Sequence, residues 1–218
     1  MIRLLISSAI ASLMILGPAS LFAETENTGT AAPASAPPSV PANTAPSIGD
    51  LFRNISPKDI PGNVIKIISD DWMLISAGTK DKFNSMTAGW GGFGVMWGKP
   101  VAFILVRNTR YTYEFLEKED SFTLSFFEEK YRPALKIFGT KSGRDTDKVK
   151  LAGFTPMAAA PGMAYSEARM IVVCKKIYGD KIKGDCATDP VKAKSLNATE
   201  DYHKLYFGEI TDVWVKKE

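Results

Sequence analysis

Hydrophobic and polar residues alternate along much of this chain with the two-residue period of half-buried strands. Short β-branched segments of this kind, separated by polar residues and glycines, predict strands at residues 63–69, 72–78, 83–90, 101–107, 121–127, 168–178 and 203–215. A helical period occurs only in short pieces, at residues 111–119, 129–139 and 143–153. Strands interrupted by a few helices, without regular strand–helix alternation, indicate a mainly β fold with helical insertions.

The first 47 residues show no strand pattern. Arg3 is followed by the apolar run "LLISSAIASLMILG" and then by "PASLFA", whose small residues resemble a cleavage site. Residues 1–23 therefore predict a Sec-type signal peptide and a periplasmic or secreted protein, with an uncleaved membrane anchor as the alternative. Residues 24–47 are rich in Ala, Pro and Ser and predict a disordered linker. The folded domain is expected at residues 48–218.

Charge and metal-binding residues narrow the function classes. The formal net charge is +3, and it falls to +2 without Arg3, which is too close to neutral to favour nucleic acid or an anionic membrane as a partner. The chain has one His and two Cys, too few for a usual zinc or haem site, so no metal is expected. From sequence alone, Cys174 and Cys186 either form a disulfide or remain two free thiols.

The segment "NSMTAGWGGFGVMWGKP" is unusually rich in glycine. Gly89, Gly91 and Gly94 match the spacing of a dinucleotide fingerprint, which also requires a helix directly after the glycines. Gly98 and Pro100 leave no room for that helix, so the match is interpreted as accidental. The glycines then either allow close approach of the backbone to something flat or form a wide loop at a strand end.

The strand that precedes these glycines is polar. Asn84, Ser85 and Thr87 place three short hydrogen-bonding side chains within four residues, and tryptophans follow at Trp90 and Trp97. One interpretation is a strand end with turn-forming residues. The other is a cradle for a planar heteroaromatic ligand, with backbone N–H groups and hydroxyls at its edge and a tryptophan against its face.

Two arginines mark the junction between a predicted strand and a predicted helix. Arg107 and Arg110 lie three residues apart, and Thr109 is expected to cap the helix that follows. Guanidinium groups at a helix start suit an anion, although a solvated surface explains them equally well.

A second cationic segment is "GTKSGRDTDK". Ser142 and Asp145 have the spacing of an acidic capping box, so a helix is expected to start near Gly143. Lys141 and Arg144 flank that start and favour an anion there, with a capped surface helix as the alternative. Together, the polar strand and two cationic helix starts suit a phosphorylated planar cofactor.

These segments also carry a family resemblance. The chain resembles the flavin reductase-like family, especially its flavoredoxin-like branch, over about residues 63–215. The matching segments, in the family's order, are "FNSMTAGWGG", "KPVAFILVRNTRYTYEFLEKEDSFTLSFF", "GTKSGRDTDK", "YSEARMIVVCKKIY" and "DYHKLYFGEI". The resemblance implies an FMN-binding split β-barrel that forms a homodimer, with flavin near the subunit interface.

The resemblance also assigns residues to the cofactor. Residues 84–87, including Met86, correspond to the strand along the isoalloxazine ring. The positions that correspond to the phosphate site are Arg107, Arg110, Ser142 and Arg144. The matching histidine of the family lies close to the flavin, so His203 is either catalytic or structural.

The leading hypothesis is an exported, flavin-dependent oxidoreductase that passes electrons through non-covalent FMN. NAD(P)H or a redox protein would donate the electrons, and the signal peptide leaves that choice open because reduced nicotinamide is scarce outside the cytosol. The alternatives are an electron carrier without a small-molecule substrate, and a barrel that has lost flavin and binds another ligand.

Overall fold

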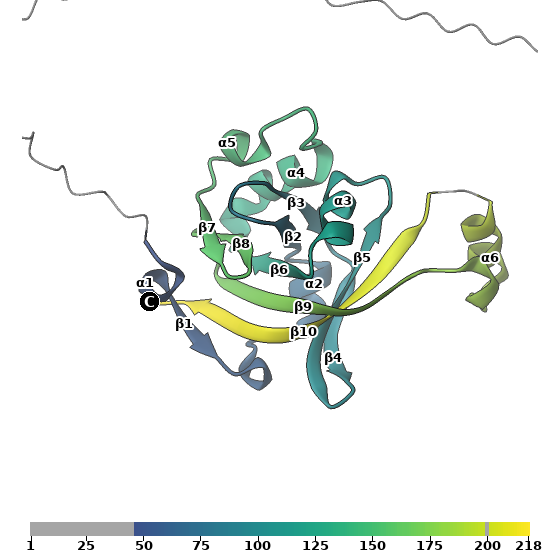
Figure 1. Cartoon of the computed structure of the whole chain (residues 1–218), viewed down its shortest axis with the longest axis horizontal. Helices are drawn as coiled ribbons and strands as arrows, with labels where there is room; N and C mark the ends of the chain where they lie inside the picture. The colour runs from purple at the N-terminus through teal and green to yellow at the C-terminus, as the bar shows by residue number, and fades with distance from the viewer. Residues whose placement is uncertain (1–45, 199–200) are drawn as a thin grey trace, which may run out of the picture. The chain divides into compact units, whose positions relative to one another are not determined.

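The computed structural model describes residues 46–198 and 201–218, except for the side chain of Asn197. The predicted signal peptide and residues 24–45 of the predicted linker lie outside these residues. An eight-stranded antiparallel sheet has the order β3-β2-β6-β9-β10-β5-β4, with β1 paired to β10 (Figure 1). Its strands are β1 (Phe52–Ile55), β2 (Met73–Gly78), β3 (Phe83–Ala88), β4 (Gly91–Met96), β5 (Lys99–Arg107), β6 (Ser121–Phe126), β9 (Met170–Lys181) and β10 (His203–Lys216). The predicted mainly β fold with helical insertions is confirmed.

The remaining elements are short. A separate hairpin consists of β7 (Pro156–Ala159) and β8 (Gly162–Tyr165). The helices are α1 (Ile48–Leu51), α2 (Val64–Ser69), α3 (Tyr111–Lys118), α4 (Arg132–Thr140), α5 (Lys148–Ala152) and α6 (Pro190–Asn197). In the part of the chain that the structure describes, no helix has the length and apolar character needed to cross a membrane.

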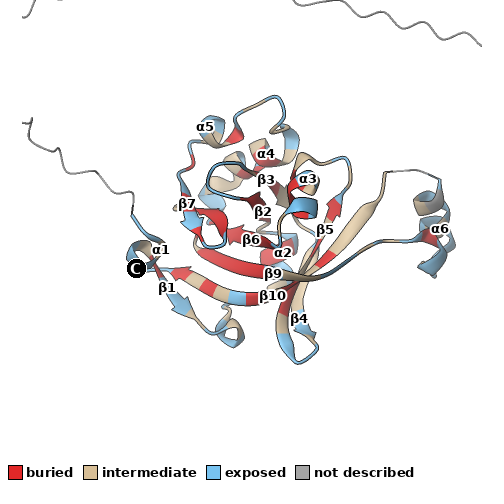
Figure 2. Ribbon diagram, in the orientation of Figure 1, coloured by how far each residue is buried: buried red, intermediate tan, exposed pale blue. Residues whose placement is uncertain are grey.

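Strands β2 and β6 and the first half of β9 are buried on both faces, and Figure 2 shows them largely in red. Along β2, Met73 and Ile75 belong to one hydrophobic cluster, whereas Leu74 between them belongs to a second. On β9, Val172 belongs to the first cluster and Ile171 to the second. Since neighbouring side chains of a strand point to opposite faces, the sheet has one core on each side.

Residues 64–69 form helix α2, so the strand predicted at 63–69 is wrong. The side chain of Asn63 accepts hydrogen bonds from the backbone N–H groups of Ile65 and Lys66, which caps the helix. A short apolar run fits a buried helix as well as a strand, and here Ile67 and Ile68 are the buried residues.

The glycine-rich segment is strand β4, which pairs with β5, and no helix follows it. The interpretation of these glycines as a wide loop is therefore wrong, whereas close backbone approach is found at Gly91 and Gly92 but not at Gly94. A Cβ on Gly91 would overlap the carbonyl oxygen of Phe103, and a Cβ on Gly92 would overlap its ring. Trp97 and Gly98 form the two-residue turn to β5 with φ of 54° and 73°, as a type I′ turn requires.

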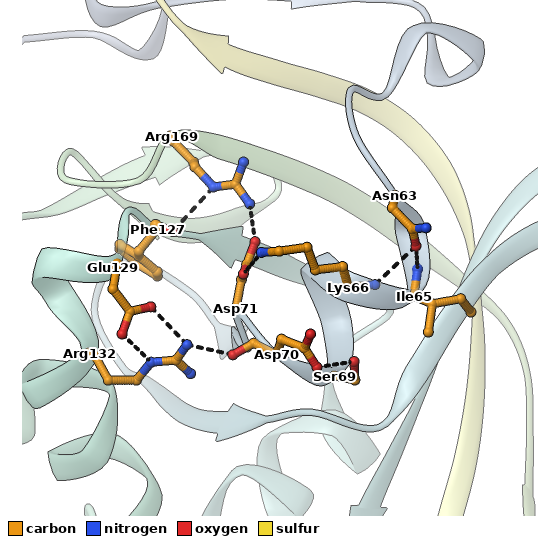
Figure 3. A network of polar contacts seen from close by, with 10 residues as sticks. All are labelled: Asn63, Ile65, Lys66, Ser69, Asp70, Asp71, Phe127, Glu129, Arg132 and Arg169. Carbon is orange, nitrogen blue, oxygen red and sulfur yellow. Dashed lines mark hydrogen bonds and ion pairs between the residues drawn. The ribbon is translucent and has the colours of Figure 1, made fainter.

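A polar network fixes helix α4 against the start of β2 (Figure 3). Arg132, the first residue of α4, donates to the backbone carbonyl of Asp70 and pairs with Glu129. Its guanidinium also lies 4.2 Å from the centre of the Trp72 ring. Beside it, Asp71 accepts a hydrogen bond from Arg169 at 2.9 Å. These contacts hold the start of α4 beside the segment that leads into β2.

The two cysteines are separate thiols. Cys174 is fully buried on β9, whereas Cys186 is exposed in the β9–β10 connection. No group of His, Cys, Asp and Glu among the described residues has the arrangement of a metal site.

Candidate functional site

Two cavities adjoin each other on either side of Met86 and Arg110, which line both. The first has a volume of about 260 Å³. It is lined by Met86, Thr87, Ala88, Gly89, Trp90, Leu105, Arg107, Arg110 and His203. We call it the aromatic cavity.

The second cavity has a volume of about 140 Å³. It is lined by Asn84, Met86, Thr109, Arg110, Tyr111, Thr112, Phe138, Thr140, Lys141, Ser142, Gly143, Arg144 and Lys148. Four of these residues are cationic and none is acidic, so we call it the cationic cavity.

Strand β3 borders both cavities, and it is an edge strand with a free backbone edge. In an antiparallel pair of strands, residues whose backbone groups hydrogen-bond to the partner strand alternate with residues whose backbone groups point away from it. The hydrogen bond from Thr79 N to Lys82 O shows which residues of β3 belong to each set. The backbone groups of Ser85 and Thr87 are among those that point away from β2. The free edge therefore presents the N–H and C=O of Thr87 and the N–H of Ser85, whose carbonyl accepts a hydrogen bond from Lys148.

The polar side chains of β3 are engaged inside the protein. The hydroxyl of Ser85 hydrogen-bonds to Ser76 Oγ and Tyr165 OH, at 2.6 and 2.7 Å. Asn84 Nδ2 donates to Thr112 Oγ1, and Thr87 Oγ1 donates to the carbonyl of Leu135. The hydroxyl of Ser85 thus faces the core, and what this residue offers at the edge is its backbone.

The cations of the second cavity come from three parts of the chain. Arg110 stands at the start of α3, Lys141 and Arg144 lie in the loop after α4, and Lys148 begins α5. Among the described residues, only Arg144 of these four forms a salt bridge, with Glu114. The other three cations of the cavity have no salt bridge to any carboxylate that the structure describes.

Lys148 is the most buried of these cations, with 5% of its surface exposed. Its Nζ donates to the carbonyl oxygen of Ser85 at 2.5 Å and lies 5.6 Å from the centre of the Phe138 ring. Burial, and secondarily the charge of Arg110, lower the pKa of Lys148 to about 8. An anion in the cavity would stabilise its charged form.

The loop at 141–147 differs from its prediction. No helix starts near Gly143: Ser142 Oγ accepts from the backbone N–H of Arg144 in a turn, and α5 begins only at Lys148. The cap of α5 is Asp147, which accepts from Lys150 N. Ser142 and Asp145 thus belong to a tight turn and do not form the predicted capping box.

Gly143 brings this loop against β3. A Cβ at this position would overlap the side-chain oxygen of Asn84 and lie 3.2 Å from the ring of Tyr111. The absence of a side chain therefore lets the loop close over the cationic cavity.

At the start of α3, the predicted capping role of Thr109 is wrong. The N-cap residue is Arg110, and it makes no side-chain capping hydrogen bond. Its Nη1 donates instead to the carbonyl of Gly139 at the end of α4. Arg107 lines the aromatic cavity and pairs with Asp201, so the structure separates it from Ser142 and Arg144, with which the sequence grouped it.

The rings of Trp90 and His203 lie against each other at the aromatic cavity, with ring centres 5.0 Å apart and planes tilted by 34°. Burial and the nearby Arg107 lower the pKa of His203, against the opposing effect of Asp201. Both effects favour the neutral form of the imidazole. Trp97, the other tryptophan considered from sequence, lies in the β4–β5 turn and lines neither cavity.

Comparison with known proteins identifies the family. The model of the flavin reductase like domain matches residues 67–218. The chain belongs to the flavin reductase-like family. No curated protein matches it.

Solved structures similar to this flavin reductase-like domain share its fold. An FMN-binding domain of a flavin reductases-like enzyme from Shewanella baltica has a TM-score of 0.55 at 16% identity, over 76% of this chain and 77% of that one. The flavoredoxins of Desulfovibrio vulgaris and Methanosarcina acetivorans both have TM-scores of 0.53, at 24% and 19% identity. Each covers 67% of this chain and 69% of its own. The fold of the domain is the split β-barrel, as the resemblance implied.

In this flavin reductase-like domain, sequence reasoning missed Lys148. The segment "GRDTDKVKLAG" shows lysines and aspartates in alternation, as on a solvated helix. Only the packing of α5 against α4, which directs Lys148 to the carbonyl of Ser85, distinguishes buried Lys148 from exposed Lys150. The only signal in the sequence was the neighbouring cationic motif.

Proposed function

We propose that the domain binds FMN, with the phosphate in the cationic cavity and the isoalloxazine ring in the aromatic cavity. The observation that carries this proposal is the adjacency of the two cavities along one free strand edge. One is lined by cations without acids, and the other by a strand backbone, an indole and an imidazole.

The donor set fits the chemistry of this cofactor. A phosphate needs several N–H donors and positive charge, which Arg110, Arg144 and Lys148 supply around a backbone turn. A planar ring edge needs both donors and acceptors, which the outward N–H and C=O groups of Thr87, in the wall of the aromatic cavity, supply. The tilted rings of Trp90 and His203 supply aromatic surface beside that edge.

Each residue then has a defined role in an oxidoreductase. The bound flavin would supply the electron-transfer chemistry, which the protein does not provide itself. The backbone of residues 85–87 orients the ring, and Trp90 shields it from water. In its neutral form, His203 offers a hydrogen bond without adding charge.

Export, dimer formation and the electron donor are part of the proposal. The signal-like residues 1–23 support a periplasmic location, and the resemblance to flavoredoxins supports a homodimer. In that compartment a redox protein or NAD(P)H would reduce the site.

The proposal is tested by the absorption spectrum of the purified protein and the mass of any ligand released on denaturation. Flavin absorption bands and the mass of FMN are expected, either as isolated or after reconstitution with FMN. A protein that remains colourless after FMN is added and unbound flavin removed would contradict the proposal.

A further inference from the structure

Arg144 differs from the other cations at the cationic cavity in having a carboxylate partner. Its Nη2 contacts Glu114 Oε1, and its Nη1 lies 3.4 Å from the carbonyl oxygen of Thr109. The guanidinium also stands 4.9 Å from the centre of the Tyr111 ring. All three partners lie on α3 or directly before it, so Arg144 joins the 141–147 loop to this helix.

Glu114 itself lies outside the cationic cavity. It lines a neighbouring cavity of about 140 Å³, and Tyr111 lines both. Arg144 thus stands at the boundary, with its charge directed to a carboxylate on one side and an anion site on the other. The two side chains are 44% and 46% exposed, so their pairing is weak enough for an anion to replace it.

We propose that Glu114 competes with the bound phosphate for Arg144 and thereby sets how tightly the domain retains its flavin. This inference rests on the proposed function, because the competing anion is the FMN phosphate. Arg110, Lys141 and Lys148 form no salt bridge among the described residues, so they can bind the phosphate without breaking an ion pair. Only the contribution of Arg144 to phosphate binding has to overcome an existing ion pair.

The position of Tyr111 supports this arrangement. Its ring lies against Arg144 and lines both cavities, so the guanidinium can turn from the carboxylate to the phosphate while it remains stacked. The movement involves a side chain and leaves α3 in place. Glu114 is therefore an affinity-determining residue that touches Arg144 and not the flavin.

The test is an equilibrium titration of the flavin-free protein with FMN and with riboflavin, which lacks the phosphate. Glu114→Gln is expected to tighten FMN binding about two- to fivefold, the range of an exposed ion pair, and to leave riboflavin binding unchanged. Glu119→Gln is the matched control, since it removes the same charge near the end of α3 from a residue without a salt bridge to Arg144. In an Arg144→Gln background, Glu114→Gln should give no gain.

The opposite results would overturn the inference. These are unchanged or weaker FMN binding in Glu114→Gln, or an equal gain for FMN and riboflavin. If the wild-type protein binds neither flavin, the proposed function fails separately, and the same variants are titrated with inorganic phosphate while the NMR signal of the Arg144 side-chain Nε–H is followed. Tighter phosphate binding by Glu114→Gln would then support the competition, and equal or absent phosphate binding would overturn it.

Discussion

The side-chain amine of Lys148 donates a hydrogen bond to the backbone carbonyl of Ser85, with 2.5 Å between Nζ and O. This contact joins the start of α5 to the free edge of β3, and so it joins the phosphate end of the proposed site to its ring end. Because Lys148 is buried and has no carboxylate partner among the described residues, its charge is available to a ligand.

Replacing Lys148 should weaken FMN binding far more than riboflavin binding. Lys148→Met removes a charge-assisted hydrogen bond to the phosphate, and such a bond contributes about 1.5–3 kcal/mol, or roughly 10- to 100-fold in affinity. Lys150→Met is the control, because Lys150 is exposed on the same helix. Fluorescence titration measures both affinities, and equal losses in the two variants would exclude a specific role for Lys148.

FMN affinity should fall as the pH rises above about 8. The pKa of Lys148 in the flavin-free protein is lowered to about 8, and the phosphate favours its charged form. Below this value the amine is already charged and no proton is taken up. Above it, binding must add a proton, so the dissociation constant should rise by up to about tenfold per pH unit.

Titrations between pH 7 and 9.5 test this dependence, since a phosphate monoester is already a dianion there with its second pKa near about 6. Arginine side chains stay charged over the same range. The Lys148→Met variant should lose the dependence. If the FMN affinity of the wild-type protein does not change over this pH range, a group other than Lys148 binds the phosphate.

A side chain at position 143 should disturb the cationic cavity. In Gly143→Ala the new Cβ overlaps the Asn84 side chain, so either the loop or Asn84 must move, at a cost of roughly 1–3 kcal/mol in stability. FMN affinity should fall with it. Gly139→Ala is the control, because its Cβ would make only an ordinary contact of 3.5 Å with Thr87. Thermal unfolding and FMN titration of both variants provide the comparison.

The β4–β5 turn should be stabilised by Trp97→Asn. Trp97 has φ of 54° and is 69% exposed, so it occupies a left-handed position while burying little surface. Asparagine followed by glycine is the preferred pair for a type I′ turn. A gain of up to about 1 kcal/mol in the free energy of unfolding is expected from urea denaturation. A loss of stability would show that the indole packs more strongly than its exposure indicates.

The sequence predicted β2, β5, β6, β9 and β10 close to their observed bounds, because each is an apolar segment flanked by polar residues or glycine. The prediction from sequence failed where a local pattern is compatible with two kinds of secondary structure. The run at 64–69 became a helix through the Asn63 cap, and the glycine-rich strand β4 exists because β5 lies beside it. Such outcomes depend on partners that are distant in sequence or on a single cap.

For the candidate site, too, the sequence predicted some features and could not show others. The sequence singled out the polar strand and the two cationic segments, and the structure brings Arg110, Ser142 and Arg144 into one cavity. It could not show that Ser85 turns its hydroxyl to the core, that Arg107 lies in the other cavity, or that Lys148 is buried. The direction of these side chains depends on which face of a strand is turned to the core and on which side of α5 is buried. The residue types alone do not determine either orientation.

A crystal structure of the domain with FMN tests the central claim most directly. We predict phosphate oxygens within about 3.2 Å of Lys148 Nζ and of the Arg110 guanidinium, with the ring edge hydrogen-bonded to the backbone of residues 85–87. A phosphate placed at Arg107, or a flavin bound away from β3, would contradict the assignment of the two cavities.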